Sequence, residues 1–291
     1  IEPTSAAGRR QSAGWFLEES GAKLLSEGKA SLYSKHANII IAEAGVNHNG
    51  SERMAFQLVD AAIAAGADAV KFQTFNAETL VTRMAKKASY QEVQTGEGSQ
   101  FAMLKGLELS ATTFWHLADY CVKKNIEFLS TPFDEESANF LIDLGCQRLK
   151  VASGELTNTP FLYSLATKGL PIILSTGMAD LKEVSEAVSI IEAVQGELGH
   201  AGLLSDPLTL LHCTSSYPTS LPDVNLRAMQ TLASQFGLPV GYSDHTSGIK
   251  VAPVARALGA RVFEKHFTLD RNLQGPDHAA SLNPKELAEM I

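Results

Sequence analysis

The chain has 291 residues, of which 45% are hydrophobic and 19% are charged, and its formal net charge is −8 at pH 7. This composition is typical of a globular protein and excludes a disordered chain, a collagen and a disulfide scaffold. The acidic balance argues against broad nucleic-acid binding, so an anionic substrate would need a local cluster of cations.

The distribution of apolar residues and cysteines indicates the cellular compartment of the protein. No apolar run approaches the roughly 18 residues of a membrane span, and the start of the chain lacks the charged-then-apolar pattern of a signal peptide. The three cysteines, Cys121, Cys146 and Cys213, lie far apart without a Cys-x-x-Cys pair, which argues against a disulfide framework or a zinc ribbon. We therefore expect a cytoplasmic protein with no nucleic-acid and no membrane partner.

Three segments are predicted in chain order. Residues 1–27 precede any predicted barrel strand and form an extension of unknown role. Residues 28–38 have weak strand character and are predicted to form an N-terminal hairpin or cap. Residues 39–291 are predicted to form one barrel domain.

Within this domain, short apolar runs alternate with amphipathic helical patterns. Eight runs are predicted to be strands: Ile39–Glu43, Asp68–Gln73, Ile126–Thr131, Arg148–Ala152, Pro171–Ser175, Leu208–His212, Pro239–Ser243 and Arg261–His266. Helices are predicted at Glu52–Ala65, Ala111–Lys124, Glu135–Leu144, Ala179–Ala193, Leu226–Phe236, Gly248–Leu258 and Pro284–Met290. Nearly continuous apolar strands that alternate with helices indicate a parallel sheet covered on both faces. Eight such units predict a closed (β/α)8 TIM barrel rather than a doubly wound sheet, because no Gly-x-Gly-x-x-Gly turn follows the first strand.

One connection is much longer than the others. Residues 74–110 join the second predicted strand to the next helix, and loops of such length commonly act as lids or binding loops.

The predicted strands end in polar residues, which matters because a barrel carries its site at the carboxyl ends of its strands. Lys71 and Lys150 lie among apolar residues, and a buried cation needs an anion. Hydroxyls near the same strand ends could complete a phosphate pocket: Thr131, Ser153 and Ser243. Glu43 is either a solvated carboxylate or a general base or hydroxyl-binding group.

Two histidines end neighbouring strands. His245 and His266 could approach each other, and two imidazoles with nearby carboxylates and water suit a divalent ion such as manganese. A closed zinc site would need more histidine or cysteine ligands. The spacing of His245 and His266 is also consistent with two structural histidines that bind no metal ion.

The motifs at these strand ends resemble those of the sialic acid synthase family, which includes N-acetylneuraminate, legionaminate and pseudaminate synthases. The resemblance covers about residues 28–291 and rests on AEAGVNHNG, DAVKFQTF, STPFD, LKVASGE, LSTGM, HCTSSYPT, GYSDHTSGI, EKHFTLD and GPDHAASL in this order. Any one motif is weak, but the ordered set is highly specific.

The resemblance implies an enzyme that condenses phosphoenolpyruvate with an N-acylated mannosamine-type aldose (an N-acylated hexosamine), giving a nonulosonic acid and phosphate. It implies a divalent metal ion, Mn2+ or Mg2+, with cleavage of the C–O bond of phosphoenolpyruvate. The residues matching the family's functional positions are His245 and His266 for the metal, Glu43, Glu155 and Asp277 for catalysis or sugar contact, and Lys71, Gln73, Thr131, Lys150, Ser153, Ser215, Tyr217 and Ser243 for substrate. Ser215 departs from the Asn of some bacterial members, which implies a shorter or water-mediated phosphate contact.

The resemblance also implies a homodimer and a small C-terminal antifreeze-like domain, which we expect to be absent from residues 1–291. In the family that domain reaches across the dimer to bind the acyl group of the sugar. If the natural protein ended at Ile291, we would expect weak or differently built sugar binding; the preferred expectation is that the sequence is truncated.

The motifs do not determine which sugar is the acceptor, and two alternative functions are consistent with the same residues. The default acceptor is N-acetylmannosamine, and the alternatives are a 2,4-diacetamido-trideoxymannose and a related altrose. One rival is a Schiff-base pyruvate aldolase that uses Lys150 or Lys71 as the amine nucleophile. The other is a non-catalytic barrel that only binds a sugar or an anion.

Overall fold

The structure is a computed structural model, and it describes residues 39–200, 204 and 206–291. The extension predicted at 1–27 and the hairpin or cap predicted at 28–38 lie outside the described residues. From Ile39 onward, all eight predicted strands are present within one or two residues of their expected bounds.

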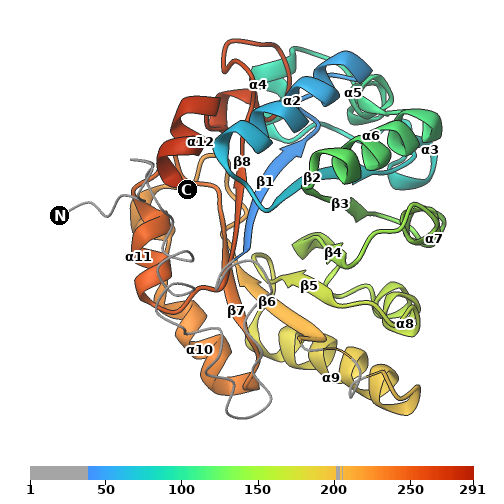
Figure 1. The fold of residues 1–291 in the computed structure, drawn as a ribbon, viewed down its shortest axis with the longest axis vertical. Helices are drawn as coiled ribbons and strands as arrows, with labels where there is room; N and C mark the ends of the chain where they lie inside the picture. The colour runs from blue at the N-terminus through green and yellow to red at the C-terminus, as the bar shows by residue number, and fades with distance from the viewer. Residues whose placement is uncertain (1–38, 201–203, 205) are drawn as a thin grey trace.

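The strands form one parallel sheet that curves into a barrel, with helices as an outer ring (Figure 1). Their order is β3-β2-β1-β8-β7-β6-β5-β4. The strands are β1 Ile39–Gly45, β2 Ala69–Thr74, β3 Glu127–Pro132, β4 Leu149–Val151, β5 Ile172–Ser175, β6 Leu208–His212, β7 Val240–Asp244 and β8 Val262–His266. The predicted (β/α)8 TIM barrel is thereby confirmed.

The barrel closes between β3 and β4, which are in contact although no ladder of backbone bonds joins them in the described part of the chain. The strand β4 has only three residues and offers few backbone groups for pairing. An ion pair bridges the two strands at their starts, where Arg148 Nε donates to Glu127 Oε1 at 2.6 Å. Side chains therefore contribute to closure where backbone pairing is lacking.

The outer helices are α2 Glu52–Ala65, α6 Ala111–Lys124, α7 Glu135–Asp143, α8 Thr159–Thr167, α9 Leu181–Glu197, α10 Arg227–Phe236, α11 Val251–Ala257 and α12 Pro284–Met290. Local signals explain their ends. Ser51 caps α2 by accepting from the backbone N–H of Met54, and Gly66 ends it at φ +91°, a conformation that favours glycine. The helix α8 was not predicted, although Asn158 caps it and Pro160 lies in its first turn.

The segment between β2 and α6 differs from the predicted loop. Residues 75–110, here named the lid segment, contain three short helices: α3 Ala77–Leu80, α4 Ser89–Thr95 and α5 Gln100–Leu107. The segment is cross-linked internally, since Ala77 N donates to Glu108 Oε1 at 2.7 Å and Lys87 Nζ donates to Thr95 Oγ1 at 2.8 Å. These helices carry few buried residues and no extended apolar stripe, which is why the sequence pattern did not predict them.

The barrel interior has an apolar base. Seven buried side chains fill it: Ile39, Ile41, Ala69, Leu129, Ile173, Leu211 and Val262. Two larger apolar layers lie between the strands and the outer helices. Over the described residues, no helix is long and apolar enough to cross a bilayer.

Candidate active site

A polar layer lies directly above the apolar base of the barrel. Side chains two residues apart on a strand share a face, so each apolar residue of the base is followed two positions later by another inward side chain. These pairs include Ile41 with Glu43, Ala69 with Lys71, Leu129 with Thr131, Ile173 with Ser175, Leu211 with Cys213 and Val262 with Glu264. Strand alternation therefore builds the floor of a pocket at the carboxyl ends of the strands.

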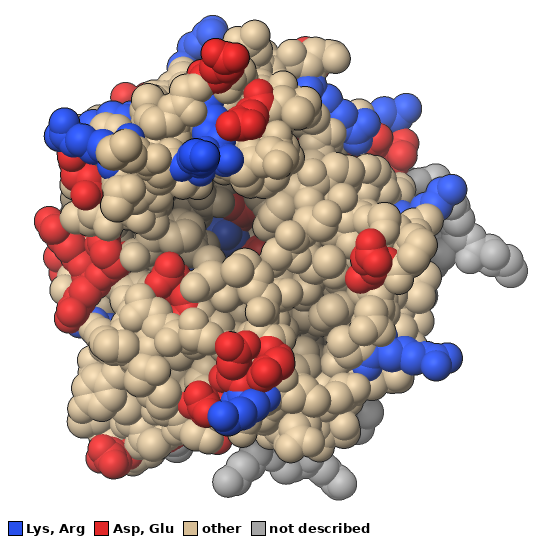
Figure 2. All heavy atoms as spheres, turned by 180° about the vertical axis from the view of Figure 1, so that it is seen from behind, with Lys and Arg blue, Asp and Glu red and all other residues tan. Residues whose placement is uncertain are grey.

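The pocket is a small polar cavity of about 80 Å³. Figure 2 shows a hollow on the face turned away from the viewer in Figure 1, with basic and acidic side chains visible inside it. The lining residues are Glu43, Lys71, Gln73, Thr131, Phe133, Lys150, Ala152, Ser153, Ser175, Cys213, Tyr217, Ser243, His245, Glu264 and His266. Ten of the thirteen residues predicted for the site are among them.

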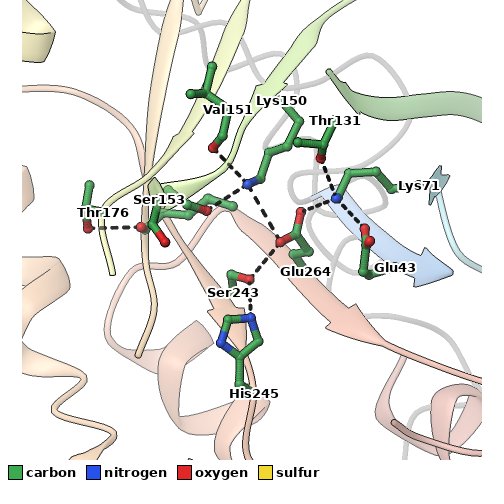
Figure 3. A network of polar contacts seen from close by, with 12 residues as sticks. Glu43, Lys71, Thr131, Lys150, Val151, Ser153, Thr176, Ser243, His245 and Glu264 are labelled. Atoms are coloured by element: carbon green, nitrogen blue, oxygen red, sulfur yellow. Dashed lines mark hydrogen bonds and ion pairs between the residues drawn. The ribbon is translucent and has the colours of Figure 1, made fainter. Parts of the chain in front are cut away.

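The two lysines approach one carboxylate from opposite sides (Figure 3). Lys71 Nζ lies 3.6 Å from Glu264 Oε2, forms an ion pair with Glu43 and donates to Thr131 Oγ1 at 2.8 Å. Lys150 Nζ lies 3.9 Å from Glu264 Oε1 and donates to Ser175 Oγ at 2.8 Å. All these charged groups are buried.

The charges of this network depend on one another. Burial alone would raise the pKa of Glu264, but the ammonium groups of Lys150 and Lys71 outweigh it and lower this pKa to about 2. Burial opposes the charge of Lys71, yet the carboxylates of Glu264 and Glu43 raise its pKa above the ordinary lysine value. Burial raises the pKa of Glu43 to about 7, against the pull of Lys71. At neutral pH, Glu264 is therefore ionised and Glu43 is poised to hold or release a proton.

The two predicted histidines lie side by side with ring centroids 5.7 Å apart. His245 Nδ1 is 2.7 Å from the carbonyl oxygen of Thr214, which can only accept, so this nitrogen carries the hydrogen. Ser243 donates its one hydrogen to Glu264 Oε1 at 2.7 Å, which leaves His245 Nε2 with a free lone pair. His266 Nδ1 is buried without a hydrogen-bond partner.

These imidazoles have the chemistry of metal ligands. Burial lowers the pKa of both, most strongly that of His266, so both rings are neutral at pH 7 as ligation requires. Within the part of the chain that the structure describes, no group of three or more His, Cys, Asp or Glu side chains could hold a metal ion. The two neutral imidazoles, each with a nitrogen lone pair that no hydrogen bond uses, fit as nitrogen ligands of a divalent ion.

The remaining predicted residues lie at or outside the rim. Ser215 Oγ is 3.4 Å from Ser153 Oγ, and Asp277 Oδ2 lies 4.0 Å from His266 Nδ1. Glu155 accepts from the amide of Asn158 at 2.8 Å and does not line the pocket. The structure thus places Ser215 and Asp277 close to the pocket, whereas Glu155 turns toward the start of α8.

Sequence reasoning left the central carboxylate out of its site set. Glu264 bridges both lysines, yet on its strand only His266 was predicted as a site residue. Its position two residues before His266 directs it into the barrel mouth, but strand alternation does not indicate that it lies between the two lysines. Ser175, next to Lys150 in space, was likewise missed.

Fold and pocket together define a (β/α)8-barrel protein whose site combines two buried ammonium groups, carboxylates and a pair of neutral imidazoles. Comparison with known proteins agrees with this class. The NeuB family model matches residues 58–291, and the chain belongs to the NeuB family. It is an enzyme that forms carbon–carbon bonds.

Three relatives illustrate the similarity. The chain is 55% identical to an N,N'-diacetyllegionaminic acid synthase of Legionella pneumophila over 253 residues, which are 87% of this chain and 70% of the relative. It is 35% identical to an N-acetylneuraminate-9-phosphate synthase of Mus musculus, over 88% of this chain and 69% of that protein. A crystal structure of the N-acetylneuraminic acid synthetase of Leptospira borgpetersenii, in complex with citrate, matches with a TM-score of 0.74 and 40% identity, covering 87% of this chain and 81% of that one.

Proposed function

We propose that this enzyme condenses phosphoenolpyruvate with a 2,4-diacetamido-2,4,6-trideoxymannose, giving N,N'-diacetyllegionaminic acid and phosphate. One observation carries the proposal: two buried lysines and two neutral imidazoles line a single pocket at the carboxyl ends of the strands. The acceptor is inferred from the higher identity to the legionaminic acid synthase, 55% against 35% for the N-acetylneuraminate-9-phosphate synthase. N-Acetylmannosamine, the default acceptor from the motifs, becomes the alternative.

The floor of the pocket suits phosphoenolpyruvate. Its phosphate and carboxylate would bind Lys71 and Lys150, whose ammonium groups are already desolvated and held by Glu264. The hydroxyls of Thr131 and Ser175 each accept from a lysine at 2.8 Å, so they keep their own hydrogens and would supply further donors. Fixing both anionic groups would hold C3 of phosphoenolpyruvate in place for attack.

The reaction forms a carbon–carbon bond and a bond from C2 to a water oxygen, and it breaks the bond from C2 to the bridging oxygen of phosphoenolpyruvate. C3 of phosphoenolpyruvate attacks the aldehyde carbon of the open-chain sugar, and C2 becomes electron-deficient. Glu43 in its ionised form stabilises this charge and then accepts a proton from the water that adds to C2, and this proton is passed on to the alkoxide left on the former aldehyde oxygen. Phosphate leaves with the bridging oxygen and takes up the second proton of that water, so the new ketone oxygen comes from water.

A divalent metal ion, Mn2+ or Mg2+, would be held by His245 and His266. When bound there, it supplies Lewis-acid polarisation of the aldehyde oxygen. The Thr214 carbonyl fixes the tautomer of His245 for this purpose, and Tyr217, packed on His245 at 4.2 Å between ring centroids, restricts its rotation.

Phosphate release with a panel of aldoses tests the proposal. We expect the 2,4-diacetamido sugar to be turned over with the highest kcat/KM, ahead of N-acetylmannosamine and the altrose analogue. In oxygen-18 water, the released phosphate should stay unlabelled. Label in the phosphate would contradict C–O cleavage, and the absence of phosphate release with every aldose would contradict the condensation.

A Schiff-base aldolase is the second candidate, because burial lowers the pKa of Lys150 and favours its nucleophilic amine form. Its ion pair with Glu264 opposes this, and Lys71 is fully charged. Borohydride with pyruvate distinguishes the two candidates, since only the aldolase would be trapped as a covalent adduct on lysine.

A further inference from the structure

The lid segment places an aromatic ring over the rim of the pocket. Tyr90, in α4, stacks on Tyr217 with ring centroids 5.7 Å apart and an interplanar angle of 27°. Tyr217 in turn lies against His245 at 4.2 Å and against His266 at 5.8 Å, edge to face. A continuous aromatic wall therefore runs from the imidazoles to the lid segment.

This wall lies on the acceptor side of the site. The lysines at the floor would take the anionic donor, so the aldehyde of the acceptor must approach from the imidazole side. The remaining carbons of the sugar then extend toward the rim, where Tyr217 and Tyr90 stand. Aromatic faces pack well against C–H surfaces and methyl groups, and poorly against hydroxyls that need hydrogen bonds.

Tyr90 is held in position by the rest of the lid segment. Lys87 Nζ donates to Thr95 Oγ1 at 2.8 Å and to the carbonyl of Gly96 at 2.9 Å, which ties the two ends of α4 together. Thr79 Oγ1 donates to Asp134 Oδ2 at 3.2 Å and joins the segment to the start of α7. By contrast Val93, on the same helix, is 80% exposed.

The phenol of Tyr90 also keeps its proton. Burial, with the nearby carboxylate of Asp277 as a second cause, raises the pKa of Tyr90 to about 12. The neutral hydroxyl accepts from the Gln91 amide at 3.4 Å and retains its own hydrogen for donation. The ring thus combines an apolar face with one polar tip.

We propose that Tyr90 is a specificity-determining residue, which with Tyr217 forms an aromatic wall that selects acceptors with an apolar C4–C6 end. This inference rests on the proposed function and deepens it. A 2,4-diacetamido-2,4,6-trideoxy sugar presents a methyl group at C6 and an acetamido methyl at C4. N-Acetylmannosamine presents hydroxyls at both positions.

Steady-state kinetics of Tyr90→Ala, Tyr90→Phe and the matched control Val93→Ala test the proposal. For Tyr90→Ala we expect kcat/KM for the diacetamido sugar to fall about tenfold more than kcat/KM for N-acetylmannosamine, mainly through KM. Tyr90→Phe, which keeps the ring, should retain most of the selectivity, and Val93→Ala should match the parent. The KM for phosphoenolpyruvate should not change in any variant. An unchanged acceptor ratio in Tyr90→Ala, or a parallel rise in the KM for phosphoenolpyruvate, would overturn the proposal.

A binding measurement separates this inference from the proposed function. The alditols made by reducing the two sugars lack the aldehyde and cannot react, so calorimetry reports their affinity without turnover. Loss of selective alditol binding in Tyr90→Ala supports the aromatic wall even if the parent enzyme releases no phosphate. Equal alditol affinities in the parent and in Tyr90→Ala overturn it even if the condensation proceeds.

Discussion

Glu264 is the residue on which the charge balance of the pocket depends. It is the carboxylate that both lysines face, at 3.6 and 3.9 Å, and it also accepts from Ser243. Its removal would leave two buried ammonium groups with only Glu43 to compensate them, and burial already favours the neutral form of Glu43. Removing one partner of a buried ion pair lowers the stability of the fold, because the other charge stays buried without compensation.

We therefore expect Glu264→Gln to lower the free energy of unfolding by about 3 kcal/mol and to reduce kcat/KM by at least about 100-fold. Urea denaturation and phosphate-release kinetics measure the two effects. Glu192→Gln, an exposed carboxylate of α9, is the control and should change neither quantity. A Glu264→Gln enzyme with the stability of the parent would show that the lysines do not depend on this carboxylate.

His245 and His266 are the residues that test the proposed metal. Replacement of either by Ala removes a ring nitrogen with a free lone pair, so we expect Mn2+ affinity to fall by more than about 100-fold. Electron paramagnetic resonance of free Mn2+ measures this without turnover, and circular dichroism checks that the fold is kept. Full turnover after exhaustive chelation would exclude the metal from the reaction.

At the scale of elements, the barrel depends on side chains where β3 meets β4. The guanidinium of Arg148 holds the carboxylate of Glu127 through Nε at 2.6 Å and Nη2 at 3.1 Å, and both side chains are largely buried. Such two-point ion pairs are stronger than single contacts, because two parallel hydrogen bonds fix the geometry.

We expect Glu127→Gln to lower the free energy of unfolding by about 1–2 kcal/mol, with a double-mutant cycle against Arg148→Met assigning the loss to the pair. Glu186→Gln is the matched control, since its pair with Lys182 is solvent-exposed and should contribute almost nothing. A coupling energy near zero in the cycle would mean that packing alone closes the barrel.

At the scale of the whole molecule, cooperative folding protects the three thiols. Cys121, Cys146 and Cys213 are buried, and burial raises the pKa of the first two to about 12. The thiolate is the reactive form, so a raised pKa and a closed environment both suppress reaction.

A polar disulfide reagent at pH 8 should therefore titrate all three thiols in urea and almost none in the folded protein. The absorbance of the released chromophore gives the number of thiols that have reacted. Rapid reaction of one thiol in the folded enzyme would show that a barrel layer opens locally.

The homodimer remains a prediction from the resemblance, and light scattering tests it. The cytoplasmic location remains a prediction from cysteine usage.

The sequence by itself determined the framework of this protein. Apolar runs that alternate with helical patterns specified eight strands in order, and the polar residues at the strand ends, among them Lys71, His245 and His266, were assigned to the mouth of the barrel. These features are local, because alternation and helix capping depend on neighbouring residues alone. Barrel closure then brings the strand ends together by symmetry, which is why separate motifs could be assigned to one pocket.

Only the tertiary structure decided which of these side chains meet, and how. The position of Glu264 between two lysines depends on three strands at once, and the stacking of Tyr90 on Tyr217 depends on a lid segment that folds against distant loops. Glu155 was predicted for the site, but the turn before α8 directs it toward Asn158. Long connections have no repeating hydrophobic pattern like that of a strand or a helix. Their conformation follows from contacts with residues far away in the chain.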